Sequence, residues 1–369
     1  MIGLYEKSKQ RLKSLSPDKN IEKILEVEGI SRRDFLKWVS VTTAMLGLPG
    51  FFEPLVAQSI NALNKIPVIW MNYQDCAGNS ESILRASKPT IDEIIINLIS
   101  LEFHELLMAP SGTQAENQLE ETIQNYEGEY LLFVEGSIPL ADNGVYGTIG
   151  PSGETYKDHL LRLASKAKAI IAVGNCASFG GVVAGNPNPT GATGVMGVDG
   201  INVPIINLPA CPVNPETMIG VLIMYALTGE LPELDSLKRP LFAYASRIHD
   251  RCERRVHFDA GEFVESFGDN ASQSGYCLYK VGCKGPFTFN NCPTVKFNDT
   301  SWPVDAGHGC IGCSEPGFVD KFGSFEKPFI EENINPAAES IKDIPFVATT
   351  ILAAFSYEKI KNIIRKENG

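Results

Sequence analysis

The stretch Ile66-Pro-Val-Ile-Trp-Met-Asn-Tyr73 begins the part of the chain that decides the fold. It is a short apolar run of the kind that forms a buried strand. Similar runs recur further along, and segments with helical periodicity lie between them. The predicted strands are 66–73, 105–109, 130–134, 167–173 and 204–208, and the predicted helices are 115–126, 155–165 and 215–227.

Alternation of strands and helices predicts an α/β fold. Parallel strands need long crossover connections, and right-handed crossovers place helices on both faces of the sheet. We therefore expect a flavodoxin-like parallel sheet with helices on both faces, over residues 66–234.

Three cysteines far apart in sequence each follow a predicted strand. Cys76 follows the first strand, Cys176 the fourth and Cys211 the fifth, and Glu135 follows the third. Because the carboxyl ends of parallel strands share one edge of an open sheet, we expect these thiols to meet there. A bound flavin would need a glycine-rich phosphate loop, and residues 77–80 match one poorly. The convergent thiols favour an iron-sulfur cluster instead.

A second group of donors lies near the end of the chain, at the spacings HxxC, Cx5C and CxxC. Its members are His249, Cys252, Cys277, Cys283, Cys292, Cys310 and Cys313. Thiolates joined by an imidazole are the donors of iron-sulfur and zinc sites, and seven donors are too many for one tetrahedral ion. Two adjacent clusters would use all seven, which indicates electron transfer. The odd total of nine cysteines disfavours a disulfide scaffold.

The chain changes character near residue 235. Helical periodicity fades, and Gly, Pro, Asn and aromatic residues increase between 275 and 316. Such a segment seldom folds by hydrophobic burial alone, so metal binding is expected to contribute to its folding free energy. We predict a small irregular cluster-binding domain over 235–325, followed by a tail over 326–369.

Residues 1–65 are predicted to be a twin-arginine signal region. Ser31-Arg-Arg-Asp-Phe-Leu-Lys37 precedes an apolar run that ends at Phe52. Such signals export proteins already folded, so clusters could be inserted before the protein reaches the periplasm. The region holds ten Lys and Arg against seven Asp and Glu, so the net charge of −12 becomes −15 for the remainder.

The acidic remainder argues against nucleic-acid binding. The late apolar stretch 344–357 is too short to cross a bilayer, for which about 20 residues are needed. Membrane contact is therefore expected through a partner.

Several motifs follow the arginine pair in a familiar order. They are Val134-Glu-Gly-Ser-Ile-Pro139, Gly174-Asn-Cys-Ala-Ser-Phe-Gly-Gly181, Leu208-Pro-Ala-Cys-Pro212, Gly275-Tyr-Cys-Leu-Tyr-Lys-Val-Gly-Cys-Lys-Gly-Pro286 and Gly307-His-Gly-Cys-Ile-Gly-Cys-Ser-Glu-Pro316. Together they closely resemble the small, electron-transferring subunit of nickel-iron uptake hydrogenases, from the signal to about residue 325. The resemblance implies a nickel-iron large subunit that splits hydrogen, three iron-sulfur clusters on this chain, and a cytochrome or other redox acceptor.

The resemblance also implies how the donors are shared. The proximal cluster would be bound by Cys76, Cys176 and Cys211. The distal four-iron (4Fe-4S) cluster would be bound by His249, Cys252, Cys277 and Cys283. The medial three-iron (3Fe-4S) cluster would be bound by Cys292, Cys310 and Cys313, with Pro303 where a fourth ligand is missing.

One position departs from the family pattern. The family has CxGC after the first strand, whereas this chain has Cys76-Ala-Gly-Asn79. A carboxamide oxygen is a poor substitute for thiolate in iron-sulfur ligation. The fourth proximal ligand could be Asn79, Asp75 or a solvent molecule, or the cluster could have only three protein ligands. We hypothesise that Asp75 or Asn79 completes a four-iron cluster.

The function expected is electron transfer from hydrogen oxidation to an external acceptor. The alternative is an iron-sulfur relay subunit of a related sulfur- or quinone-linked oxidoreductase, which would lack the donors of residues 249–313. Outside the donor sets, His159 is expected on the surface of a helix.

Overall fold

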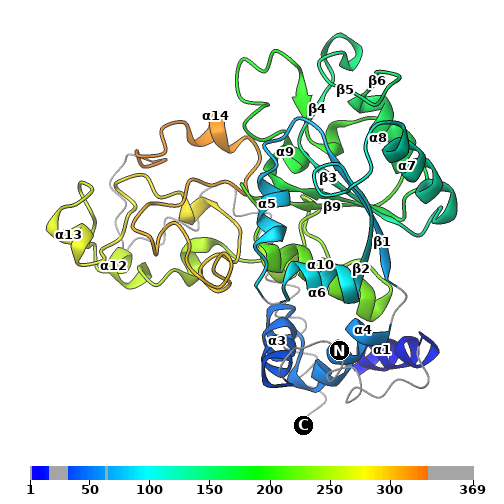
Figure 1. Cartoon of the computed structure of the whole chain (residues 1–369). Coiled ribbons are helices and arrows are strands. Elements are labelled where there is room, and N and C mark those ends of the chain that lie inside the picture. The colour runs from blue at the N-terminus through cyan, green and yellow to red at the C-terminus, as the bar shows by residue number, and fades with distance from the viewer. Residues whose placement is uncertain (1, 16–31, 63–64, 88, 331–369) are drawn as a thin grey trace.

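A five-stranded parallel sheet forms the centre of the computed structural model, which describes residues 2–15, 32–62, 65–87 and 89–330 (Figure 1). The strand order is β2-β1-β3-β7-β9. When the five strands of this sheet are numbered in chain order, this is 2-1-3-4-5, the order of flavodoxin-like folds. The strands are β1 (Ile66–Asn72), β2 (Ile99–His104), β3 (Leu131–Glu135), β7 (Ala169–Val173) and β9 (Ile205–Leu208). The predicted fold class is confirmed.

One predicted strand was wrong. Residues 105–109 lie outside any strand, and the strand of this part of the chain is β2, with Ile66 of β1 paired with Ile99. The strand β2 lies at the edge of the sheet, where partly exposed residues such as Ser100 and Glu102 dilute its apolar pattern. The denser apolar run that follows is exposed, with Leu106 at 52 %.

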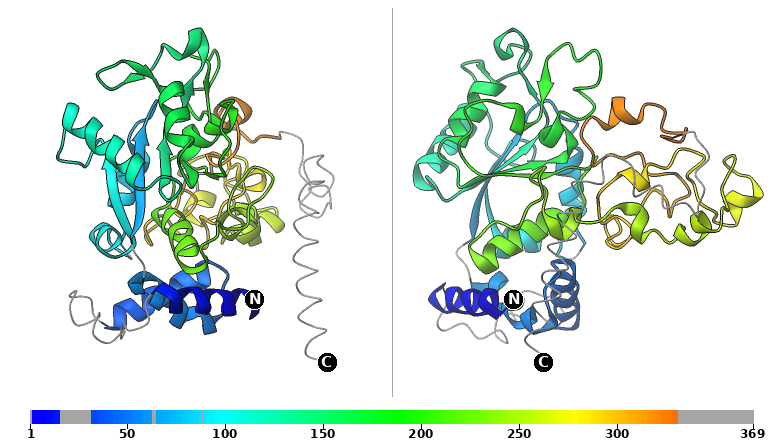
Figure 2. Two further views of the ribbon diagram at one scale, coloured as in Figure 1. Left: turned by 90° about the vertical axis from the view of Figure 1, so that its right-hand side faces the viewer. Right: turned by 180° about the vertical axis from the view of Figure 1, so that it is seen from behind.

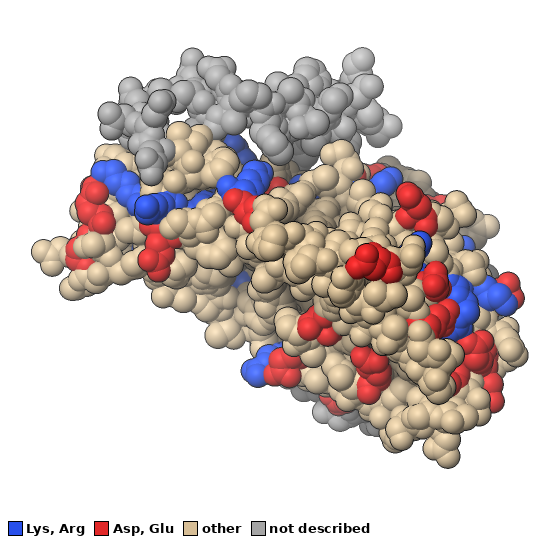
Figure 3. Space-filling view, turned by 90° about the horizontal axis from the view of Figure 1, so that it is seen from above, with Lys and Arg blue, Asp and Glu red and all other residues tan. Residues whose placement is uncertain are grey.

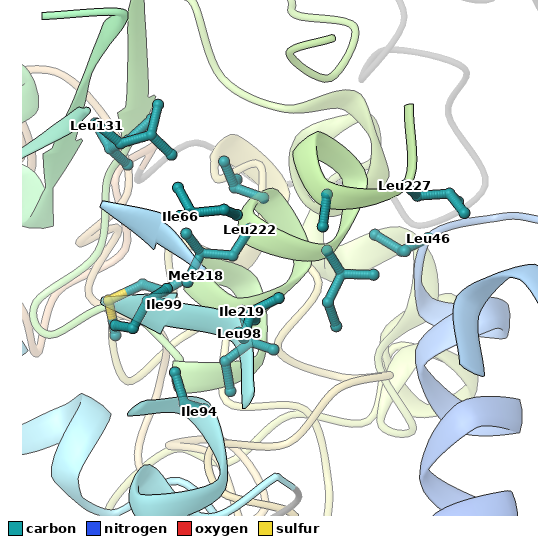
Figure 4. Packing of buried hydrophobic residues seen from close by; sticks show 14 of the residues in the cluster. Leu46, Ile66, Ile94, Leu98, Ile99, Leu131, Met218, Ile219, Leu222 and Leu227 are labelled. Carbon is teal, nitrogen blue, oxygen red and sulfur yellow. The ribbon is translucent and has the colours of Figure 1, made fainter. Parts of the chain in front are cut away.

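Helices cover both faces of the sheet (Figure 2). On one face, α7 (Thr113–Asn125) and α8 (Tyr156–Ala164) pack against alternate residues of the central strands. On the other face, α10 (Pro215–Thr228) covers the remaining set. Figure 4 shows its Met218 and Leu222 in one cluster with Ile66 and Ile99 of the sheet. The sheet is therefore buried on both sides, as a parallel sheet requires.

Three α-helices in the described part of residues 1–65 pack beneath α10 (Figure 1). They are α1 (Ile2–Leu15), α3 (Arg32–Met45) and α4 (Glu53–Ala62). Their buried side chains include Leu12, Val39 and Phe52, which join the same hydrophobic core as α10. Because α10 is apolar on nearly all sides, the face turned away from the sheet also needs a cover. The described part of the predicted signal region thus packs on the body.

The irregular region, residues 235–325, projects from the carboxyl side of the sheet as loops and short helices (Figure 1). The helices are α11 (Leu241–Tyr244), η5 (Ile248–Arg251), α12 (Arg255–Asp259), α13 (Asn270–Gln273), η6 (Gly285–Phe287) and α14 (Phe318–Phe322). Its main hydrophobic cluster is small and includes Cys310 with Ile248, Val264 and Trp302.

The remaining elements are short and connect the layers. They are η1 (Gly50–Phe52), α5 (Gly78–Leu84), α6 (Ile91–Glu93), η2 (Ile94–Leu98), β4 (Ile138–Pro139), η3 (Ala141–Gly144), β5 (Thr148–Ile149), β6 (Glu154–Thr155), α9 (Gly174–Phe179), β8 (Ala192–Thr193) and η4 (Val195–Gly197).

Within the described part of the chain, no helix has the length and apolar character needed to span a bilayer. The apolar stretch 344–357 and most of the predicted tail lie outside the described residues. On the face shown in Figure 3, acidic side chains spread over the sheet-containing body, and most basic side chains lie beside acidic ones.

Candidate metal centres

The carboxyl edge of the sheet brings three thiols together, as the sequence predicted. The charges that act on the Cys176 thiol include those of Cys211 and Cys76. Cys176 lies in the first turn of α9, directly after β7, and burial raises its pKa to about 11. Gly181 has a positive φ, and a Cβ there would lie 2.4 Å from the Cys176 Sγ, so only glycine leaves room for this thiol. Cys76 and Cys211 are exposed at the edge.

Asn79 lies behind these thiols, and hydrogen bonds engage both ends of its carboxamide. Its Nδ2 and its backbone N–H donate to Glu135 Oε1, at 3.1 and 2.7 Å. Its Oδ1 accepts the backbone N–H of Val213 at 3.0 Å, and the residue is buried. Ligation of iron through Oδ1 would therefore compete with the bond from Val213.

Glu135 is the centre of this buried network, which the sequence did not reveal. The carboxylate is fully buried and also accepts bonds from Trp70 Nε1, Asn72 Nδ2 and the backbone and side chain of Ser80. The Ser80 hydroxyl in turn contacts His104, whose pKa burial lowers to about 4. These N–H and O–H groups together satisfy the hydrogen-bonding capacity of the buried Glu135 carboxylate, so it needs no cation beside it.

Asp75, the other candidate for the fourth proximal ligand, is half-buried next to Cys76. Its Oδ2 accepts a bond from Asn72 Nδ2 at 2.5 Å. Burial raises the pKa of Asp75, and the bond from Asn72 opposes that shift.

A pocket in the irregular region is lined by all four residues expected at the distal cluster. They are His249, Cys252, Cys277 and Cys283. The Nε2 of His249 is buried and has no hydrogen-bond partner. Burial lowers the pKa of this imidazole to about 4, so it is neutral at pH 7, the form that binds metals. An unpaired ring nitrogen in a pocket lined by three thiols fits a metal cluster.

The pocket thiols are protonated in the metal-free chain. Burial raises the pKa of Cys252 to about 11 and that of Cys277 to about 12. The same cause raises the pKa of Cys283. Metal binding must displace these protons, and the thiolate–metal bonds then supply the free energy that burial of the charges costs.

The three residues expected at the medial cluster form a deeper set. Burial raises the pKa of Cys292 to about 12. Burial also raises the pKa values of Cys310 and Cys313. The charges acting on Cys310 include those of Cys313 and Cys292, which indicates that the three lie together. Nearby, Trp302 Nε1 is a buried donor without a partner, and Pro303 is exposed.

Two backbone amides connect the three donor sets in series. The Cys310 N–H donates to Cys283 Sγ at 3.3 Å, which joins the medial set to the distal one. The Cys211 N–H donates to the Cys313 thiol, which joins the proximal set to the medial one. Gly309 permits the first contact, because a Cβ there would lie 2.8 Å from the Cys283 backbone. The donor sets are therefore neighbours in the order proximal, medial, distal.

A buried ion pair holds the loop after Cys313. Arg239 contacts Glu315 at 3.2 Å and Asp235 at 2.8 Å, and Glu315 also accepts the Phe289 N–H. Glu315 is far from Arg239 in sequence, so no local motif predicted the pair.

His159 was wrongly expected on a helix surface. It is buried and contacts the Tyr73 hydroxyl at 3.0 Å.

No three His, Cys, Asp or Glu side chains among the described residues come close enough to surround a single metal ion. The donors instead line wider spaces, such as the pocket around His249. Their sulfur-rich chemistry fits iron-sulfur clusters.

Comparisons with known proteins cover both parts of the chain. Residues 244–326 match the family model for the C-terminal part of the NiFe/NiFeSe hydrogenase small subunit, and residues 76–225 match "NADH ubiquinone oxidoreductase, 20 Kd subunit". The quinone-reactive Ni/Fe-hydrogenase small chain of Wolinella succinogenes is 50 % identical, over 90 % of this chain and 94 % of its own. The periplasmic [NiFe] hydrogenase small subunit 1 of Nitratidesulfovibrio vulgaris is 45 % identical, over 84 % and 96 %.

Solved structures agree with these matches. A chain of the reduced, active Ni-Fe-Se hydrogenase from Desulfomicrobium baculatum superposes with a TM-score of 0.68 and 36 % identity. The superposition covers 72 % of the present chain and all of that one.

Proposed function

This chain belongs to the family of nickel-iron hydrogenase small subunits, and from that premise we propose that it transfers electrons from hydrogen oxidation through three iron-sulfur clusters to an external acceptor. Its partner in the heterodimer is the large subunit, where the nickel-iron centre resides. The serial contacts between the three donor sets carry the proposal, because each set touches the next through one backbone amide.

The donors divide among three clusters as follows. We assign Cys76, Cys176 and Cys211 to the proximal cluster, His249, Cys252, Cys277 and Cys283 to a distal 4Fe-4S cluster, and Cys292, Cys310 and Cys313 to a medial 3Fe-4S cluster. The pocket lined by the four distal residues and the unpaired His249 Nε2 support the distal assignment. Exposed Pro303, which has no donor atom in its side chain, occupies the missing fourth medial position. Iron-sulfur clusters accept and release one electron at a time.

The residues of this chain tune that chemistry. Backbone N–H groups donate to the thiols, as from Arg254 to Cys252 at 3.4 Å and from Gly312 to Cys310 at 3.4 Å. Such bonds stabilise extra negative charge on sulfur and raise the reduction potential. A neutral imidazole in place of one thiolate at the distal site acts in the same direction.

The proximal cluster is proposed to be a four-iron cluster with Asp75 or Asn79 as its fourth ligand. Asn79 would have to release the Val213 N–H to ligate through oxygen, whereas Asp75 would give up a side-chain bond from Asn72. The exposed Cys76 and Cys211 mark the edge where the large subunit would cover the cluster.

The acceptor is proposed to be a cytochrome or other redox protein that links the heterodimer to the membrane. The 50 % identical relative is described as quinone-reactive, and another is described as periplasmic. The first description supports membrane contact through a partner, and the second supports a periplasmic location. We propose twin-arginine export as the route to that location, on the Arg32-Arg33 motif.

Iron analysis and electron paramagnetic resonance (EPR) on the purified heterodimer test the proposal. We expect iron for two four-iron clusters and one three-iron cluster, with the three-iron signal in the oxidised protein. Cys292→Ser should remove that signal alone, and the matched Cys176→Ser should affect only the proximal cluster. Iron for fewer than three clusters, or no three-iron signal in the wild type, would contradict the proposal.

A further inference from the structure

Lys284 is a fully buried lysine between the distal ligand Cys283 and Gly285. Its Nζ donates to the carbonyl oxygens of Gly282 at 2.5 Å, Lys327 at 2.7 Å, Ser324 at 3.3 Å and Phe325 at 3.5 Å. All of these partners are acceptors. A neutral amine would present its lone pair to carbonyl oxygens, so the site fits the ammonium ion.

No carboxylate pairs with this ammonium among the residues that the structure describes. The groups whose charges act on it are the thiols of Cys283 and Cys310. Burial lowers the pKa of Lys284, and Cys283 and Cys310 oppose that shift when they carry the negative charge of cluster-bound thiolates. A buried cation is costly unless an anion lies nearby, and among the described residues the groups that act on Lys284 and would become anions are the proposed cluster ligands Cys283 and Cys310.

The two thiols belong to different clusters. Cys283 is assigned to the distal set and Cys310 to the medial set, and the Lys284 backbone N–H also donates to the Cys310 carbonyl at 2.7 Å. Lys284 therefore sits at the junction of the two sites: it directly follows Cys283 in the chain, its backbone N–H binds the Cys310 carbonyl, and its side chain interacts electrostatically with both thiols.

We propose that the Lys284 ammonium is a shared counter-cation of the medial and distal clusters, an inference that rests on the proposed function. Each cluster gains negative charge when it is reduced, and a fixed positive charge in a low-dielectric interior stabilises that form. The charge of Lys284 thus raises the reduction potentials of the medial and distal clusters together and leaves that of the proximal cluster unchanged.

Redox titration followed by EPR in the purified heterodimer tests this role. Lys284→Met removes the charge and the donors, Lys284→Gln keeps a donor without the charge, and Lys284→Arg keeps the charge. We expect the Met and Gln variants to shift the medial and distal midpoint potentials downward, and the Arg variant to stay near the wild type. Lys280→Met is the matched control, because Lys280 is half-exposed, pairs with Glu265 and should shift neither potential.

The outcomes separate the inference from the proposed function. A wild-type protein without the expected iron and three-iron signal would refute the function itself. Normal iron with unchanged potentials in Lys284→Met or Lys284→Gln would refute the counter-cation. If both neutral variants lose iron and Lys284→Arg retains it, the need for a charge is supported. Loss of iron in all three variants would show that shape and hydrogen bonding, rather than charge, make Lys284 necessary.

Discussion

The sheet and the irregular region differ in how deeply they bury their donors. At the carboxyl edge, Cys76 and Cys211 are exposed, and the frame that positions them is a large hydrophobic core whose buried members include none of the donors. In the irregular region, Cys310 and Cys277 are themselves members of small hydrophobic clusters. The sheet therefore folds around apolar side chains, whereas we expect the irregular region to need metal–ligand bonds to complete its core.

Removal of iron should separate the two regions most strongly. After chelation under reducing conditions, residues 244–326 should lose nearly all protection against amide hydrogen exchange, because protonated thiols cannot replace the cluster. The strands β1, β3 and β7 should keep theirs. Exchange followed by mass spectrometry measures both in one experiment, and protection that persists in residues 244–326 would show that this region folds without metal.

The converse test weakens the sheet and leaves the donors alone. Leu132 is fully buried in β3, and Leu132→Ala should lower the free energy of unfolding of the sheet by about 2–5 kcal/mol through lost contacts and a cavity. Leu106→Ala, at an exposed leucine, should change it by less than about 0.5 kcal/mol. Denaturant titration of the purified chain gives both values, and equal effects would mean that the assigned core is wrong.

Acid should destabilise the sheet-containing part of the chain by protonating the buried His159. Burial lowers the pKa of His159 to about 4, below its ordinary value of 6.5, so the unfolded chain binds this proton more tightly. The neutral imidazole stabilises the fold fully above about pH 6.5, and up to about 3 kcal/mol is lost as the pH falls to about 4. His159→Gln should flatten this part of the pH profile. His257→Gln, at a half-buried histidine, is the control, and an equal flattening there would contradict the assignment.

A smaller effect is expected at the proximal site. Asn79→Cys leaves the Val213 N–H with a weak acceptor, which should cost about 1–3 kcal/mol of stability. If position 79 is a ligand position, the new thiolate should also lower the proximal reduction potential. Asn79→Ala loses the same hydrogen bonds without adding sulfur, so equal potentials in the two variants would exclude position 79 as a ligand.

Sequence reasoning worked best where one periodicity dominates. Four of the five strands and the helices α7, α8 and α10 lie close to their predicted bounds, because buried strands and amphipathic helices have distinct apolar spacings. It failed at β2, whose partly exposed edge residues weaken the pattern beside the apolar run at Leu106.

The site divides in the same manner. The topology of a parallel sheet was enough to bring Cys76, Cys176 and Cys211 to one edge. The Glu135 network and the Arg239–Glu315 pair could not be predicted. Both join side chains that are far apart in sequence, and no local pattern shows that such side chains meet in space. Nor could sequence alone show that both ends of the Asn79 carboxamide are occupied.

The hydrogen bond from the Cys310 amide to Cys283 has a consequence for biogenesis. This bond forms only when the loops of the two donor sets are packed against each other. The bond from the Cys211 amide to Cys313 likewise requires that the loops of those two sets are in contact. Filling one site therefore orders its neighbour, and we expect maturation to be cooperative along the chain. An apoprotein that has received one cluster is already partly prepared to receive the others, so each later cluster should be inserted faster than the first.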